Sequence, residues 1–384
     1  MTRVCHIISG LGTGGAEMML ANLVARTDRA RHDVAVISLL DRGTLGGRIE
    51  RSGGQLRVLG MRRGVPTPMA LFKLRKMLKT LRPDVIQGWM YHGNLAASLG
   101  AALLGKPVPV VWGIHHSLYD IAKERRLTQW VIRASARWSQ NPAATVYVSR
   151  LSAEQHAAFG FHAERAQVIP NGFDLEAFQP DPERRAAARA ALGLDPAHAL
   201  IGVVARYHPM KDHPNFLNAA ARLARDWPEA RFLMAGTGTG PDNPVLNGLI
   251  GELGLAGRVY ALGERSDVPD LMAALDILCM SSSHGEAFPM VVGEAMASGL
   301  PCAVTEVGDA GWLVGETGRV APPRDAEALA AALGGLLALG RAGREDLGRL
   351  ARARVAEHFS LERSVAAYQA VYDGIIGAIA EGER

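Results

Sequence analysis

The sequence has 384 residues, of which 48% are hydrophobic and 21% charged, and its formal net charge is +4. This length is long for one hydrophobic core and sufficient for two domains of ordinary size. The composition excludes a disordered or low-complexity chain, and no apolar run reaches the roughly 18 residues that a membrane-spanning helix requires.

Charge is divided unevenly along the chain. Residues 1–175 hold 23 Lys and Arg against 11 Asp and Glu, whereas the remainder holds 19 against 27. We therefore expect the first part to meet an anionic partner, such as a phosphate or an anionic membrane surface. Nucleic acid is disfavoured, because the chain has no recognisable binding motif and no aromatic–basic interleaving.

Short apolar runs rich in β-branched residues alternate with amphipathic helical patterns from end to end. In the first half, strands are expected at 4–9, 33–40, 56–61, 84–90, 108–114 and 144–149. The pattern then restarts, and strands are expected at 200–207, 231–236, 259–264, 276–281 and 302–307. Continuous apolar strands separated by helices indicate parallel sheets that are covered on both faces.

The sequence therefore predicts two tandem Rossmann-like, doubly wound α/β domains that face each other across a cleft. The segment IPNGFDLEAFQPDPE (169–183) is rich in Pro, Asp and Asn and marks their junction. We expect the first domain to span 1–172 and to include a C-terminal helix, 360–384, that packs back on it. The second domain is expected to span 173–359.

The cysteines and the N-terminus indicate the cellular compartment of the protein. Cys5, Cys279 and Cys302 lie in apolar runs without metal-ligand spacing, and the N-terminus enters a strand-like run without a signal-peptide cleavage site. These features predict buried, reduced thiols and a cytoplasmic protein.

The first expected strand is followed by SGLGTGGAE (9–17), in which Gly10, Gly12 and Gly15 satisfy G-x-G-x-x-G. Glycines let a backbone approach a phosphate, and the amides of a helix start attract its charge. A nicotinamide-binding enzyme also needs an acidic residue about 20 positions further on, and the only candidate, Asp41, lies somewhat far along. The loop therefore favours a phosphate over a nicotinamide dinucleotide, and a structural turn is the alternative.

The first strand of the second domain leads into ARYHPMKDHPN (205–215), which contains Arg206 and Lys211. A planar guanidinium and a mobile ammonium together suit a diphosphate and supply positive charge without a metal. The chain has no Asp-x-Asp pair in a strand-end loop, so we expect no metal and no cofactor. The alternative is that both side chains belong to the solvated surface.

In HGEAFPMVVGEAMASGLPCAV (284–304), Glu286 and Glu294 flank the start of a helix, and Pro289 suits its first turn. Eight helical residues rise about 12 Å, which is too far for both carboxylates to act on one carbon as a glycosidase pair does. The spacing suits two hydroxyl-bearing parts of one long ligand, such as a nucleotide sugar. The alternative is two acidic residues near the positive end of a helix.

Taken together, Arg206…Lys211, Glu286-x₇-Glu294, the Gly-rich loop and IPNGFD resemble a retaining family-4 glycosyltransferase of the GT-B fold. The likeness runs along essentially the whole chain and is typical of bacterial polysaccharide and lipid-linked glycan assembly. It implies metal-independent transfer of a hexosyl residue from a UDP- or GDP-linked sugar to a glycan or lipid-linked acceptor, with retention. The alternatives are an NAD(P)-dependent oxidoreductase and a non-catalytic nucleotide-sugar-binding protein.

The resemblance also implies roles for single residues. Arg206 and Lys211 hold the donor diphosphate, Glu286 contacts the donor sugar, and Glu294 contacts the ribose. Further donor-binding positions are implied at Gly14, Gly15, Ala287, Phe288, Pro289 and Met290.

The family's functional histidine lies in WGIHHS (112–117), where His115 is the better match and His116 the second. One position departs from the family, because Trp312 stands where many members have a glutamate. The resemblance therefore does not fix the base or the sugar of the donor.

Members of this family often act on lipid-linked sugars at the cytoplasmic face of a membrane. The segment 61–84 contains a leucine stripe surrounded by Lys and Arg, which predicts peripheral attachment to an anionic membrane. The alternative is that these leucines face the sheet. At another strand end, Trp89, Tyr91 and His92 are expected to offer a stacking surface to an acceptor sugar. His116 is also expected among the acceptor-binding residues.

Overall fold

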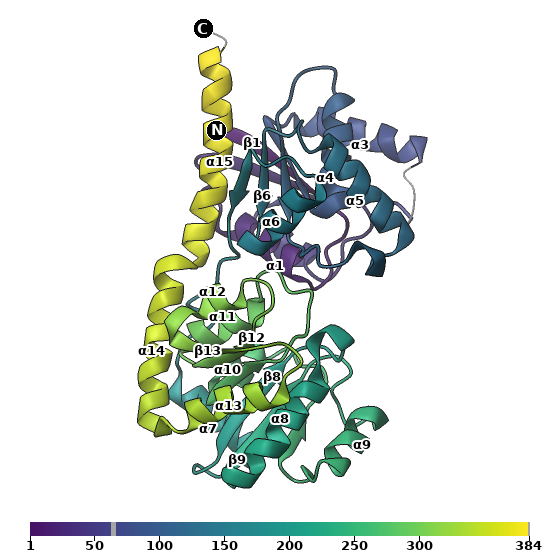
Figure 1. The fold of residues 1–384 in the computed structure, drawn as a ribbon. Coiled ribbons are helices and arrows are strands. Elements are labelled where there is room, and N and C mark those ends of the chain that lie inside the picture. Colours follow the sequence, from purple (N-terminus) through teal and green to yellow (C-terminus); the bar gives the residue numbers. More distant parts are fainter. Residues whose placement is uncertain (63–66, 383–384) are drawn as a thin grey trace. The chain divides into compact units, whose positions relative to one another are not determined.

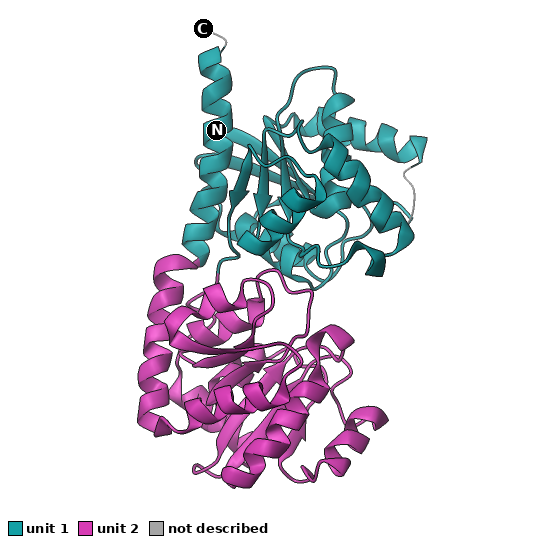
Figure 2. Ribbon diagram, viewed as in Figure 1, with its two compact units in different colours: residues 1–172, 361–384 teal, residues 173–360 magenta. Residues whose placement is uncertain are grey.

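The computed structural model describes residues 1–62 and 67–382. The chain forms two compact units, which are residues 1–172 with 361–384 (unit 1) and residues 173–360 (unit 2) (Figure 2). Each unit contains one parallel sheet covered by helices (Figure 1). The predicted fold class, two doubly wound α/β domains in tandem, is confirmed.

The first part of unit 1 follows a strand–helix alternation. It comprises β1 Thr2–Ile8, α1 Gly15–Arg26, β2 His32–Ser38, α2 Gly46–Arg51, β3 Gln55–Val58, α3 Pro68–Leu81, β4 Val85–Trp89 and α4 Met90–Ala102. The alternation continues with β5 Val110–Ile114, α5 Arg126–Trp138, β6 Ala144–Tyr147, α6 Arg150–Phe159 and β7 Ala166–Val168. The C-terminal helix α15, Leu361–Gly382, completes the unit.

The seven strands of unit 1 have the order β3-β2-β1-β4-β5-β6-β7. Residue Ile8 at the end of β1 pairs with Ser38 of β2 on one side and with Trp89 of β4 on the other. The order of the strands therefore reverses between β1 and β4, and ligands of open α/β sheets bind beside such a switch point.

Helix α15 belongs to the core of unit 1. Its residues Leu361, Val365, Tyr368, Val371 and Tyr372 are buried together with apolar residues of β1, β2, β4 and α1. The prediction that the C-terminal helix packs on the first domain is confirmed, and Figure 1 shows α15 in yellow alongside that sheet.

Helix α3 contributes to a separate core cluster of unit 1. Leu74 and Leu78 are buried there with Ile86 and Ala97, so the leucine stripe faces the sheet rather than a lipid surface. The residues 63–66 of the predicted basic segment lie outside the described residues.

Unit 2 repeats the alternation. Its elements are α7 Pro182–Ala191, β8 Ala199–Val204, the 3-10 helix η2 Pro209–Lys211, α8 His213–Asp226, β9 Ala230–Ala235, α9 Pro244–Glu252, β10 Val259–Ala261, α10 Val268–Ala274 and β11 Ile277–Met280. They continue with α11 Met290–Ala297, β12 Cys302–Thr305, α12 Ala310–Val314, β13 Gly318–Ala321, α13 Ala326–Leu337 and α14 Gly340–His358.

The strands of unit 2 have the order β10-β9-β8-β11-β12-β13, and the switch point lies between β8 and β11. Each predicted strand overlaps an observed one, although several observed strands end a few residues earlier. The edge strands β7 and β13 were not predicted, because both are short and neither carries a continuous apolar run.

All three cysteines are buried and unbonded, as predicted. Within residues 1–62 and 67–382, no single helix is long and apolar enough to cross a membrane. Only α13 and α14 taken as a pair meet that test of length and composition, and a bend of 102° separates them.

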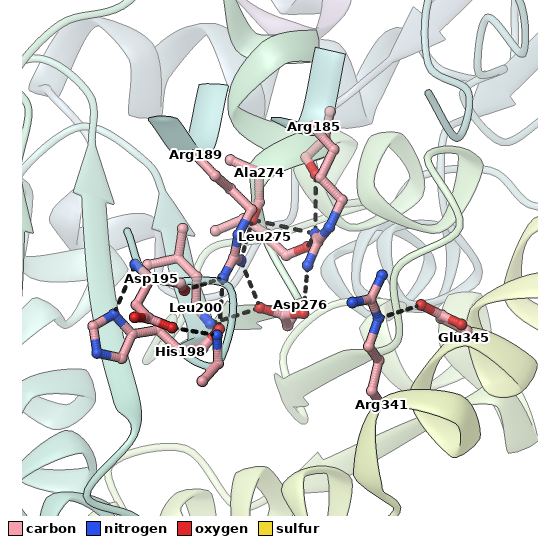
Figure 3. Close-up of polar contacts among 12 residues, drawn as sticks. Arg185, Arg189, Asp195, His198, Leu200, Ala274, Leu275, Asp276, Arg341 and Glu345 are labelled. Carbon is pink, nitrogen blue, oxygen red and sulfur yellow. Dashed lines mark hydrogen bonds and ion pairs between the residues drawn. The ribbon is translucent and has the colours of Figure 1, made fainter. Parts of the chain in front are cut away.

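An ion-pair network closes the amino-terminal edge of the unit 2 sheet (Figure 3). The carboxylate of Asp276 accepts from Arg185 at 2.7 Å, from Arg189 at 3.0 Å and from the amide of Leu200 in β8 at 2.8 Å. Because Arg185 and Arg189 come from α7, this single carboxylate ties the first helix of the unit to its central strand.

Replacement of Asp276 by Ala should destabilise unit 2 by roughly 3–5 kcal/mol, because the Arg189 side chain is only 9% exposed and would lose its carboxylate partner. Denaturant unfolding monitored by circular dichroism measures this loss. The matched control is Asp346→Ala, which removes an exposed pair with Arg349 and should cost less than about 1 kcal/mol. Equal losses in both variants would contradict the structural role of Asp276.

Candidate active site

The switch point of unit 2 brings together two loops that carry the predicted donor-binding residues. The loop after β8 contains Arg206 and Lys211, and the loop after β11 runs from Ser281 to Pro289. Because β8 and β11 are neighbours in the sheet, their carboxyl ends lie side by side. The topology therefore explains how residues some 70 positions apart in sequence reach one site.

Lys211 and Glu286 form an ion pair at this site. The Lys211 Nζ lies 2.5 Å from Glu286 Oε1, which also accepts a hydrogen bond from the Ser282 hydroxyl at 2.6 Å. Both side chains are largely buried, with 18% of Lys211 and 10% of Glu286 exposed. A charge-assisted hydrogen bond of this kind is stronger than a neutral one, so the ammonium and the carboxylate are held in place before any ligand arrives.

Backbone contacts between the two loops hold this pair. The Ser283 amide donates to the Met210 carbonyl at 2.8 Å, and the Ser281 hydroxyl donates to the Lys211 carbonyl at 2.8 Å. Gly285 has a φ of +78°, and a Cβ added there would lie 2.6 Å from the Met210 sulfur. A side chain at position 285 would therefore be strained by the positive φ and would displace the Met210 side chain.

Arg206 differs from Lys211 in its surroundings. Its side chain is exposed, and within the described part of the chain the guanidinium has no hydrogen-bond or ion-pair partner. The site thus combines one cation that is already neutralised by Glu286 with one that is free to bind an anion.

Helix α11 begins directly after these loops without a side-chain cap. Its N-cap residue is Pro289, and no side chain accepts from the amides of its first turn. Asp212 and Asp325 do cap α8 and α13 of the same unit. The uncapped amides at the start of α11 carry partial positive charge and suit an anionic ligand.

The side chain of Phe288 points away from this opening into an aromatic cluster. Its ring centroid lies 6.0 Å from Phe173, 5.8 Å from Trp312 and 5.4 Å from Phe359, and the residue is 5% exposed. The residues Ala287 and Phe288 therefore offer a ligand their backbone rather than their side chains. Trp312, which departs from the family pattern, packs beneath the loop.

Glu294 lies on α11 and takes no part in the Lys211–Glu286 ion pair. Its carboxylate has no hydrogen-bond or ion-pair partner among the described residues. Burial raises the pKa of Glu294 to about 7, since desolvation disfavours the charged form of a carboxyl group. A raised pKa of this size is typical of functional sites.

The switch point of unit 1 carries the predicted Gly-rich loop. Gly14 is the N-cap of α1, and as a glycine it supplies no side-chain cap. A Cβ added at Gly12 would have no described atom within 4 Å, so the loop backbone is open at that residue. Glu17 in the first turn was not predicted as a site residue; it lies against Gly14, and burial raises its pKa.

His115 and His116 follow β5 and are engaged differently. His115 Nε2 lies 3.2 Å from the hydroxyl of Tyr368, and burial lowers the pKa of His115 to about 4. His116 lies 3.3 Å from the hydroxyl of Tyr91 and 3.4 Å from a carboxylate oxygen of Glu124. Burial also lowers the pKa of His116.

The predicted stacking surface for an acceptor is wrong for two of its three residues. Trp89 is fully buried and donates from its indole nitrogen to His6 at 3.1 Å. Tyr91 is 3% exposed, and its hydroxyl lies 2.7 Å from His156. Both rings therefore belong to the core of unit 1. Trp89 is the last residue of the buried strand β4, and Tyr91 lies in the first turn of α4. His92 is half-buried, and its role stays a prediction.

Two further site residues were not predicted from the sequence. Ser282 is 1% exposed and binds Glu286, and the only sequence signal is the run of three serines directly after a buried strand. Tyr368 reaches His115 from α15, at a separation that no local pattern reveals. Among residues 1–62 and 67–382, no group of three or more His, Cys, Asp or Glu side chains is placed to hold a metal ion.

Comparison with known sequences matches both units. The family described as "Glycosyltransferase Family 4" matches residues 13–177, and "Glycosyl transferases group 1" matches residues 198–338. The chain is a glycosyltransferase with one domain of each type. It is 29% identical to EpsF of Bacillus subtilis over 80% of this chain and 81% of that protein.

Other relatives match the transferase over shorter regions. The lipopolysaccharide core biosynthesis mannosyltransferase LpsB of Rhizobium meliloti is 32% identical over 54% of this chain and 61% of its own length. Solved structures match the fold along the whole chain. Anabaena HepE in complex with UDP gives a TM-score of 0.82 at 21% identity and covers 99% of this chain and 100% of its own.

The raised pKa of Glu294 makes the stability of the transferase depend on pH. An unfolded chain ionises this carboxyl above about pH 4.5, whereas the folded chain keeps it protonated up to about pH 7. The contribution of Glu294 to the free energy of unfolding therefore falls as pH rises from about 4.5 to about 7 and then levels off. Glu294→Gln removes this titration, so the variant should gain up to about 2–3 kcal/mol over the wild type between pH 5 and pH 8.

Denaturant unfolding of both proteins at pH 5, 6.5 and 8 measures this difference. A matched control is Glu252→Gln, at an exposed position in the last turn of α9, which should change the free energy of unfolding by less than about 0.5 kcal/mol. A constant difference between wild type and Glu294→Gln over this range would show that the site does not desolvate Glu294.

Proposed function

We propose that the enzyme transfers a hexosyl residue from a nucleotide sugar to a glycan or lipid-linked sugar, with retention at the anomeric carbon and without a metal. The observation that carries this proposal is the cationic strand-end site of unit 2. A largely buried Lys211–Glu286 pair, a free guanidinium at Arg206 and the uncapped start of α11 lie on adjoining segments at one edge of the sheet. Such a combination suits a diphosphate linked to a hydroxyl-rich sugar.

The relatives support a nucleotide sugar as donor. HepE has been crystallised with UDP and with UDP-glucose, and LpsB is named as a mannosyltransferase of lipopolysaccharide core biosynthesis. On this analogy we favour a UDP-linked donor over a GDP-linked one, and an acceptor from bacterial surface polysaccharide assembly. Cytoplasmic location is part of the same proposal.

In the proposed reaction, the bond between the anomeric carbon and the diphosphate breaks, and negative charge develops on the departing phosphate. Arg206, Lys211 and the amides at the start of α11 stabilise that charge. Glu286 accepts hydrogen bonds from sugar hydroxyls while Lys211 and Ser282 hold its carboxylate. The acceptor oxygen bonds to the anomeric carbon on the face from which the phosphate departs, and the departing phosphate takes the acceptor's proton.

Glu294 has a different task in this scheme. It contacts the ribose, which does not react, so its contribution should appear in donor affinity rather than in the chemical step. The unpartnered carboxyl of Glu294 is available for such hydroxyls, and protonation near pH 7 lets it either donate or accept.

The identity of the donor can be tested by thermal shift with UDP, GDP, ADP and their common sugars, because a true donor stabilises the folded protein by mass action. With that donor, Lys211→Ala should lower kcat/KM about 100-fold or more, as expected when one group that stabilises transition-state charge is removed. Arg206→Ala should act in the same direction. Glu294→Ala should raise the donor KM with a smaller effect on kcat.

Arg225→Ala is the matched control, since Arg225 is an exposed arginine in the last turn of α8 and away from these loops. It should leave kcat/KM unchanged. Donor binding without turnover in the presence of acceptors would contradict the proposed activity, and an inverted product seen by NMR would contradict retention. A fall in kcat alone for Glu294→Ala would contradict the ribose assignment.

We further propose that α3 attaches the enzyme to an anionic membrane surface. Its residues Leu74 and Leu78 are buried, but its outer side exposes Met69 and Phe72, each 61% accessible, together with Lys73, Lys76 and Lys79. A recess of about 480 Å³ on this side is lined by Phe72, Arg75, Lys76, Lys79, Thr80 and Arg82. Apolar side chains among lysines suit the interface of an anionic bilayer.

The enzyme should therefore sediment with anionic liposomes at low salt and be released near 0.5 M salt, since screening shortens the range of the attraction. Each basic residue near such a surface contributes about 1 kcal/mol, so Lys73→Glu, Lys76→Glu and Lys79→Glu together should abolish sedimentation. Hydrolysis of free donor should be unaffected. Sedimentation that ignores both salt and these three substitutions would contradict the proposal, and a protein that never sediments would favour a soluble phosphorylated acceptor.

A further inference from the structure

The imidazole of His115 is enclosed by aromatic groups of unit 1. It stacks on the ring of Trp89, with centroids 5.0 Å apart and an interplanar angle of 29°. The same Trp89 ring stacks on Tyr368 of α15 at 5.7 Å and 28°. Tyr368 is fully buried, and its hydroxyl lies 3.2 Å from His115 Nε2. One ring face and one nitrogen of His115 are therefore fixed by two buried aromatic residues.

We propose that Tyr368 is a positioning residue for His115, donating its hydroxyl hydrogen to Nε2 and thereby fixing the orientation and the tautomer of the ring. This inference rests on the proposed function and on a role for His115 in it, as the resemblance to family-4 glycosyltransferases implies for this histidine. The residue comes from the C-terminal helix, which the sequence assigned only a packing role.

The protonation states support this direction of donation. Burial raises the pKa of Tyr368, so its phenol stays protonated, and the lowered pKa of His115 makes the imidazole neutral at pH 7. A neutral imidazole carries one hydrogen. If Nε2 accepts from Tyr368, that hydrogen is on Nδ1.

The surroundings of the other ring nitrogen, Nδ1, are the second observation. Both His115 Nδ1 and Asn171 Oδ1 are buried without a hydrogen-bond partner, and the Asn171 side chain acts on the ring to favour its protonated form. Hydrogen on Nδ1 is the tautomer that lets Nε2 accept from the Tyr368 hydroxyl. Tyr368 therefore selects the Nδ1–H tautomer.

Both partners are themselves held near the connections between the units. Asn171 lies next to Gly172, the last residue of the first segment of unit 1, and Tyr368 lies two turns into α15. The hydroxyl of Ser364 in α15 donates to the carbonyl of Pro170 at 2.7 Å and so joins the two segments. The orientation of His115 therefore depends on chain segments that adjoin both connections.

The test compares Tyr368→Phe with Tyr372→Phe. Tyr372 is a matched control, because it lies one turn further along α15, is equally buried and donates its hydroxyl to Gln87 instead of His115. Both variants lose one buried hydroxyl and keep the ring. Histidine-selective ¹⁵N labelling and long-range ¹H–¹⁵N correlation report the tautomer of His115, whose signals are assigned by their loss in His115→Ala.

The wild type and Tyr372→Phe should show the Nδ1–H tautomer, and Tyr368→Phe should show a mixture with the Nε2–H form. Tyr368→Phe should also lower kcat about three- to tenfold, the factor that one hydrogen bond contributes, with the donor KM changed less than about twofold. An unchanged tautomer in Tyr368→Phe, or an equal fall in kcat for Tyr372→Phe, would overturn the inference. Unchanged kcat in His115→Ala would instead refute the proposed role of His115, while the tautomer measurement would still decide the positioning by Tyr368.

Discussion

The ion pair between Lys211 and Glu286 is the interaction on which the unit 2 site depends. Neither group would be stable alone at its degree of burial, since an unpaired charge away from water is costly. The pair therefore joins the loop after β8 to the loop after β11. The backbone hydrogen bond from Ser283 to Met210 joins the same two loops. In the proposed mode of binding, a donor diphosphate would meet Lys211 in an arrangement already set, so little reorganisation would accompany binding. Arg206 is exposed and has no partner among residues 1–62 and 67–382, so in the proposed site it could approach the ligand without first breaking a bond.

Much of this arrangement follows from the sequence, for a topological reason. Continuous apolar runs indicated parallel strands, and in a parallel sheet all the strand-end loops lie at one edge. Arg206, Lys211 and Glu286 each follow such a run. The sequence therefore predicts that they lie at one edge of the sheet, although it does not give the distances between them. The order β8–β11, which makes two of these loops direct neighbours, was not predicted from the residues alone. The resemblance to known glycosyltransferases supplied the roles, and the geometry of the Lys211–Glu286 pair came only from the structure.

The failures have a physical reason as well. Trp89 and Tyr91 lie at a strand end, and the sequence therefore predicted that they could stack on a sugar. However, a side chain at a strand end can point either to solvent or to the helices that cover the sheet. The stretch QGWMYHGN contains no sign of which side each ring takes. The missing information lies in α15, whose Tyr368 and Tyr372 fill the space above β1 and β4 and enclose Trp89 in the core. Long-range packing of this kind leaves no periodic trace in either segment.

An aromatic cluster beneath the start of α11 contains Trp312, at the position where the resemblance to family-4 glycosyltransferases implies a glutamate in many members. Its ring packs against Phe288 and Phe359, with centroids 5.8 Å and 5.2 Å apart, so the substitution extends an apolar cluster instead of leaving a charge unpaired. Phe173, the first residue of unit 2, completes the cluster.

Because the Phe288 side chain is held in this cluster, the backbone from Ala287 to Met290 is held with it. Gly308 lies so close that an added Cβ would contact the carbonyl oxygens of Glu286 and Ala287 at 2.6 and 2.7 Å. Rigid amides at a helix start recognise phosphate regardless of the base. If these amides bind the donor phosphates as proposed, selectivity for the base must come from side chains other than these.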